Sequence, residues 1–76
     1  MAGVSIRKKA IIEKYNGKTA RIFLSSGHSF IGIVADVEDE DDAIEIYNPR
    51  FGRTLISARR IAAISEFNKE MEEGDF

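Results

Sequence analysis

The sequence predicts a small, mainly β protein: an N-terminal helix followed by a small, strongly bent, five-stranded antiparallel barrel. Residues 5–17 carry apolar side chains at helical spacing, and from Lys18 onward apolar and polar residues alternate. Turn-forming Gly, Asn and Pro then recur at short intervals, which is typical of tight connections between short strands. A long strand with an internal glycine follows the first of these turns, and it predicts the bend.

The helix is predicted over about 5–15. Ser5 can cap its first turn, because a serine oxygen accepts a hydrogen bond from a backbone N–H of that turn. Asn16-Gly17 ends it, since both residues tolerate a positive φ. The apolar face is expected at Ile6, Ala10, Ile11 and Tyr15, and the polar side at Arg7, Lys8 and Lys14.

The barrel is predicted over 18–67. Ala20, Ile22 and Leu24 alternate with polar residues in a first strand, and Ser26-Gly27 turns the chain. In the second strand, 28–37, the apolar parity slips near Gly32, which indicates a bulge or a sharp bend. The remaining segments are a solvated acidic loop at 38–42, strands at 44–47, 54–57 and 61–67, and turns at 48–52 and 58–60.

Composition indicates a single domain, 1–67, with an acidic tail at 68–76. The chain has 76 residues, 43% of them apolar, and no cysteine, so disulfides and thiolate metal sites are excluded. No apolar run approaches the length of a membrane span, and the N-terminus lacks the apolar core of a secretory signal. We therefore expect a soluble cytoplasmic protein with no membrane contact. Because so small a core gives little stability, oligomerisation is the expected reinforcement.

Charge is arranged in blocks. The formal net charge is −2, but basic residues dominate 1–21 and 50–60, whereas acidic residues dominate 36–46 and the tail. Such blocks predict faces of opposite sign, so the face that a partner meets matters more than the total charge. The last two predicted strands are short and apolar, which favours an unpaired edge that accepts another chain and closes a ring. The alternative is a monomer whose helix or tail covers that edge.

Two motifs resemble those of the Sm/LSm family, including its bacterial Hfq branch, over about Val4 to Phe67. The first motif reads Leu24, Gly27, Phe30, Gly32, Val34 and Val37, and the second reads ISARRIAAI from Ile56 to Ile64. The resemblance implies an Sm-like (SH3-like) barrel in a homo-oligomeric ring whose last two strands pair between neighbours. The interface residues it implies are Leu55, Ile56, Ile61, Ile64 and Phe67.

The resemblance also implies where a base would bind, and there this sequence departs from the family. The family holds a base with an Asp and an Asn in the loop after the long strand, beside a flat or long side chain, and completes the pocket with Arg-Gly. Here Asp42 occupies the stacking position, and Ser57 and Ala58 occupy the Arg-Gly positions. Glu38 or Asp39 fills the Asp position and Ala43 the Asn position.

Other residues are candidates for single-stranded RNA binding. Arg59 and Arg60 are candidates for phosphate or base contact, with salt bridges to the acidic loop of the same or the next subunit, or simple solvation, as alternatives. Phe51 beside Arg50 combines an aromatic ring with a guanidinium, a pairing that suits single strands, although it could instead pack on the tail or a neighbour. Lys8 and Lys9 on the helix could meet phosphates or form a solvated face.

No catalytic or metal site is predicted. His28 has no second His or Cys to share a metal, and Ser25, Ser26 and His28 match no nucleophile–base spacing. We expect no enzyme activity and no cofactor. The expected function is an Sm-like, RNA-binding homo-oligomeric ring in RNA processing. The alternatives are a ring-shaped scaffold that has lost RNA binding, or a monomeric SH3-like barrel that binds a peptide.

Overall fold

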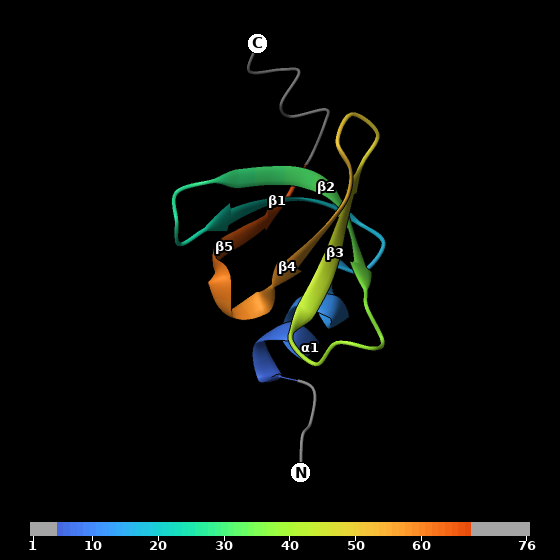
Figure 1. Cartoon of the computed structure of the whole chain (residues 1–76), viewed down its shortest axis with the longest axis vertical. Helices are drawn as coiled ribbons and strands as arrows, with labels where there is room; N and C mark the ends of the chain where they lie inside the picture. Colours follow the sequence, from blue (N-terminus) through green and yellow to red (C-terminus); the bar gives the residue numbers. More distant parts are fainter. Residues whose placement is uncertain (1–4, 68–76) are drawn as a thin grey trace.

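A computed structural model of the protein describes residues 5–67, and the predicted acidic tail at 68–76 lies outside them. Its strands form one antiparallel sheet in the order β4-β3-β2-β1-β5 (Figure 1). The predicted fold class, an N-terminal helix followed by a bent five-stranded antiparallel sheet, is confirmed. The elements are α1 (Ile6–Tyr15), β1 (Thr19–Leu24), β2 (Ser29–Asp36), β3 (Ala43–Asn48), β4 (Gly52–Ser57), the 3-10 turn η1 (Ala58–Arg60) and β5 (Ile61–Glu66).

The sheet curls because β2 changes partners along its length. Residues 29–33 of β2 pair with β1, and residues 33–36 pair with β3. The register is continuous through this change, so of the two predicted forms of irregularity β2 has the bend rather than the bulge, and Figure 1 shows its curvature. A register shift occurs instead between β1 and β5, at Phe23 and Leu24. The curl brings β4 and β5, the two ends of the sheet, close enough for η1 to join them.

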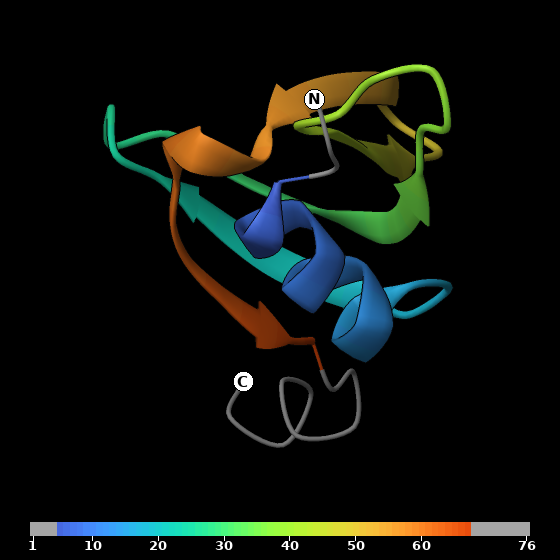
Figure 2. The same ribbon diagram turned by 90° about the horizontal axis from the view of Figure 1, so that it is seen from below.

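The helix α1 lies across the inside of the curled sheet, as Figure 2 shows. Most of the core consists of β-branched side chains, which suit strands that pack on one face. Among residues 5–67, no helix has the length and apolar character needed to cross a membrane. The core residues are Ile11, Tyr15, Ala20, Ile22, Val34, Ile44, Ile46, Ile56, Ala58 and Ile61.

The rotation of α1 about its axis differs from the predicted one. Ile6, expected in the apolar face, is 88% exposed, whereas Lys8, expected on the polar side, is 2% exposed. The buried face runs through Lys8, Ile11 and Tyr15, which are also spaced at helical intervals. The cap itself is as predicted, since the Ser5 oxygen accepts a hydrogen bond from the Lys8 backbone N–H at 3.0 Å.

Gly32 is the position where the bend leaves no room for a side chain. A Cβ atom added there would lie 2.5 Å from the Tyr47 carbonyl oxygen and 2.6 Å from Ile46 Cγ2. We expect Gly32→Ala to lower the free energy of unfolding by about 1–3 kcal/mol, because the backbone of β3 would have to move away from β2. Urea unfolding followed by circular dichroism measures this, with Ser29→Ala on the same strand as the control. Equal stability of both variants would contradict this account of the bend.

Candidate functional site

The loop between β2 and β3, residues 37–42, is held against the helix by the side chain of Lys8. Its Nζ donates to the carbonyl oxygen of Val37 at 2.7 Å and to that of Glu40, and it forms an ion pair with Asp36 Oδ1 at 3.1 Å. An ammonium group has three N–H donors, and these three partners use all of them. The prediction that Lys8 offers a surface contact to RNA is therefore wrong, because its side chain is enclosed and fully bonded.

A second cluster is centred on the carboxylate of Asp42. It accepts hydrogen bonds from the Ser57 hydroxyl, from the side chain of Ser5, and from Arg59 Nε at 3.1 Å. The Asp42 carbonyl oxygen also accepts from the Ala58 N–H at 2.5 Å. This one residue thus joins the start of the helix, the acidic loop, the end of β4 and the 3-10 turn. We call Ser5, Asp42, Ser57 and Arg59 the Asp42 cluster.

These contacts lower the pKa of Asp42 well below its ordinary value. The largest cause is the hydrogen bond from Ser57, followed by that from Ser5, while partial desolvation acts in the opposite direction and the bonds from Arg59 add to the lowering. Donated hydrogen bonds favour the ionised carboxylate, which can accept several of them at once. Asp42 is therefore ionised at neutral pH, where its role is that of a hydrogen-bond acceptor.

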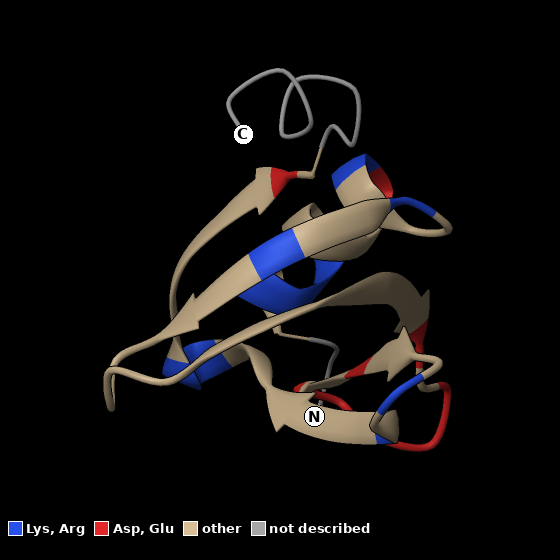
Figure 3. Ribbon diagram, turned by 90° about the horizontal axis from the view of Figure 1, so that it is seen from above, with Lys and Arg blue, Asp and Glu red and all other residues tan. Residues whose placement is uncertain are grey.

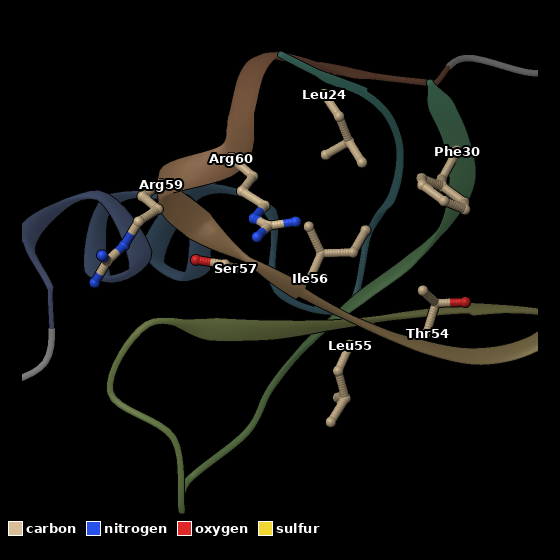
Figure 4. A pocket seen from close by; sticks show the side chains of 8 residues that line it. All are labelled: Leu24, Phe30, Thr54, Leu55, Ile56, Ser57, Arg59 and Arg60. Atoms are coloured by element: carbon tan, nitrogen blue, oxygen red, sulfur yellow. The ribbon is translucent and has the colours of Figure 1, made fainter. Parts of the chain in front are cut away.

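The two arginines of η1 point in different directions. Both line the hollow beside β4, and Figure 4 shows Arg60 extending toward Ile56 while Arg59 extends to the side away from Leu24 and Phe30. The hollow has a volume of about 490 Å³. The predicted alternative of a salt bridge within the subunit is found for Arg59, through Asp42. Within residues 5–67 the Arg60 guanidinium has no hydrogen bond or ion pair, so its role in RNA binding stays a prediction.

The positions that the resemblance assigned to a base pocket do come together. Asp42 and Ser57 are in direct contact, and the acidic loop lies beside η1. They are bonded to each other, however, so the Ser57 hydroxyl is already committed to the carboxylate, and an acid has no flat face on which a base could stack. The prediction that these two residues contact RNA is not supported by their geometry.

The remaining predicted RNA contacts lie elsewhere on the surface. Lys9 is exposed on the helix, next to the enclosed Lys8. Phe51 is 76% exposed at the tip of the β3–β4 hairpin, beside the exposed Arg50. Figure 3 shows acidic residues gathered along the β2–β3 loop, with others on the helix and at the end of β5, and basic residues spread over the helix, β1, η1 and the hairpin tip. Phosphate would therefore be repelled at the loop and attracted at several other places.

The predicted interface residues differ in how far their side chains are exposed. Leu55 is 60% exposed on β4, and Ile64 is partly buried on β5. The side chains of Ile56 and Ile61 are only 5% and 4% exposed, so they belong to the core of the monomer, and only their backbone could take part in an interface. The ring of Phe67 lies 5.6 Å from the guanidinium carbon of Arg21.

The contacts of two residues at the site, Ser5 and Asp36, were not predicted from the sequence. Ser5 was predicted only as a helix cap, yet it also binds the Asp42 carboxylate. Asp36 was counted among the acidic block, yet it pairs with Lys8. Neither has a signal in the sequence, because both depend on how the helix is placed against the loop. Within residues 5–67, no group of three or more His, Cys, Asp or Glu is placed to hold a metal ion.

Comparison with protein-family models, with curated proteins and with solved structures found no match. The function is therefore inferred from the geometry of the chain itself.

The role of Lys8 can be tested by replacing it with an uncharged residue of similar length. Lys8→Met keeps the packing of the stem but leaves the Val37 and Glu40 carbonyl oxygens without their donor. We expect the free energy of unfolding to fall by about 1–3 kcal/mol. Lys9→Met, the same change at the exposed neighbour, should have little effect in the same urea titration. A fully stable Lys8→Met would show that the loop does not need this ammonium.

The role of Asp42 can be tested by its pH dependence. Because folding lowers its pKa, the carboxylate stabilises the folded state above the ordinary pKa of about 4, and this stabilisation is lost as the pH falls further. Asp42→Asn should therefore be less stable than the wild type at pH 7, and the difference should shrink below about pH 4. Urea unfolding at a series of pH values measures this. Asp39→Asn, at an exposed acid of the same loop, is the control, and a difference that does not vary with pH would refute the role.

Proposed function

We propose that the chain is one subunit of an Sm-like homo-oligomeric ring that binds single-stranded RNA through basic and aromatic surface. The observation that carries the ring is the outer edge of β4. Within residues 5–67, β4 pairs only with β3, and its other side meets no strand. Leu55 stands exposed in the middle of this strand. Apolar side chains on a free strand edge favour pairing with another chain.

The complementary surface is β5 at the other end of the sheet. Within the described residues β5 pairs only with β1, and the small residues Ala62 and Ala63 are exposed along it. The helix uses part of this strand, since the carbonyl oxygens of Ile61 and Ile64 accept from Arg7 Nη1 at 2.6 Å and from the Tyr15 hydroxyl at 3.4 Å. Pairing of β4 with the β5 of a second copy would be a head-to-tail contact, which closes a ring when the rotation between subunits allows it.

The RNA part of the proposal is supported by surface chemistry. Cationic side chains without partners in the described residues include those of Lys9, Arg50 and Arg60. Copies of these groups around a ring would attract a polyanion, and the attraction would weaken steeply as salt rises. The family's base pocket gives no support, because the Asp42 cluster occupies its place.

The alternative function is a ring that acts as a scaffold or a protein-binding module without RNA. The Asp42 cluster favours it, since residues that would hold a base are bonded to one another. The exposed acids of the β2–β3 loop also favour it, because they would repel phosphate near the centre of a ring.

Native mass spectrometry at low salt tests the ring and the RNA together. We expect one closed oligomer for the wild type, and an added mass when a short uridine-rich RNA is present. Leu55→Lys should shift the protein to monomers, because a charge on the β4 edge opposes strand pairing. Ile33→Lys, the same change at a half-exposed residue of the central strand β2, should leave the oligomer intact.

The outcomes separate the alternatives. An oligomer that takes up no RNA would favour the scaffold. A monomeric wild type would contradict the ring altogether.

A further inference from the structure

The tip of the β3–β4 hairpin presents an aromatic ring over a hollow. Phe51 is 76% exposed, the second-highest exposure among the large apolar side chains of residues 5–67. The hollow beside it has a volume of about 410 Å³, within the range of small-molecule sites. It is lined from β2 by Ser29, Phe30 and Ile31, and from the hairpin by Asn48, Arg50 and Phe51.

The turn that carries Phe51 is held in place by Asn48. The side-chain amide of Asn48 donates to the Ile31 carbonyl oxygen at 2.7 Å, and its Oδ1 accepts from the Arg50 N–H at 2.8 Å. The Asn48 carbonyl oxygen accepts from the Phe51 N–H at 3.0 Å. These bonds tie the turn to itself and to β2. An exposed aromatic on a fixed turn loses little conformational entropy when it binds a ligand.

The charge at this tip is positive. Arg50 is exposed, and within residues 5–67 its guanidinium has no hydrogen bond or ion pair. The Arg53 side chain is 75% exposed, and its ion pair with Glu45 is long at 3.7 Å. No acidic residue lines the hollow. An anionic ligand with an apolar, planar part would therefore match both the positive charge of the tip and the aromatic ring of Phe51.

We infer that each subunit binds one unstacked base of single-stranded RNA in this hollow, with the base against Phe51 and the flanking phosphates near Arg50 and Arg53. The inference rests on the proposed RNA-binding ring and moves the contact from the Asp42 cluster to the hairpin tip. Bases of a single strand expose the flat face that an aromatic ring can stack on, and Arg supplies charge to the backbone beside it. In the proposed homo-oligomeric ring, every subunit would carry one such site.

Fluorescence anisotropy with a labelled uridine decamer tests this on the 76-residue chain, with native mass spectrometry of each variant. Phe51→Ala should weaken binding by about fivefold or more while the oligomer stays intact. Phe51→Trp should keep the affinity, and its fluorescence should change on binding. The signal would report on position 51 alone, because the natural sequence has no Trp.

Arg50→Gln should lower the salt dependence of binding, whereas Lys14→Gln, a matched loss of charge on the helix, should leave it unchanged.

The results separate this inference from the proposed function. If the wild type binds RNA and Phe51→Ala binds it equally well, the tip is not the site, although RNA binding stands. If Phe51→Ala breaks the oligomer, the Phe51 side chain packs against a neighbouring subunit and the inference is wrong. If the wild-type oligomer binds no RNA, the inference fails together with the RNA part of the proposed function.

Discussion

The arrangement of helix, sheet and acidic loop depends on one buried ammonium group. Lys8 lies in the buried face of α1, where an apolar residue would be expected, and its Nζ meets Val37, Glu40 and Asp36. Burial of a charge is costly unless every donor finds a partner, so the helix and the loop must adopt one mutual position. The loop, which the sequence describes only as polar, is thereby folded against the helix through its backbone carbonyl groups.

The Asp42 cluster extends this constraint to the far end of the sheet. Asp42 follows the segment held by Lys8, and its carboxylate accepts hydrogen bonds from Ser57 and Arg59. The same loop therefore fixes the positions of β4 and the 3-10 turn. Asp36 and Asp42 are the two acidic residues with the clearest structural roles. Each forms an ion pair with a cationic side chain from another element, Asp36 with Lys8 and Asp42 with Arg59. A loop rich in carboxylates is thus compatible with a compact fold, because Asp42, its least exposed acid, is partnered and the acids at 38–41 face solvent.

The fold could be predicted from the sequence, whereas the site could be predicted only in part. Ile44 and Ile46 alternate with polar neighbours between clear turn residues, and both are buried as that pattern requires. The rotation of the helix could not be predicted, because periodicity counts Lys8 as polar, and the carbonyl groups that allow its burial lie far along the chain. The resemblance implied that Asp42 approaches Ser57. Asp42 and Ser57 also form a hydrogen bond with each other, and Arg59 joins them. This depends on side-chain geometry, which the spacing of residues in the sequence does not determine.

The β3–β4 hairpin separates two regions of opposite charge. Asp42 precedes β3 and Phe51 follows it, and six residues of extended strand span about 17–20 Å. This length exceeds the Debye length of about 8–10 Å at physiological ionic strength, so the acids of the loop scarcely reduce the positive potential at the tip. In the proposed ring, the acidic loops of all subunits would reinforce one another near the centre and repel phosphate there. The same hairpin would then direct an RNA strand toward its tips, because its two ends are too far apart for their charges to cancel.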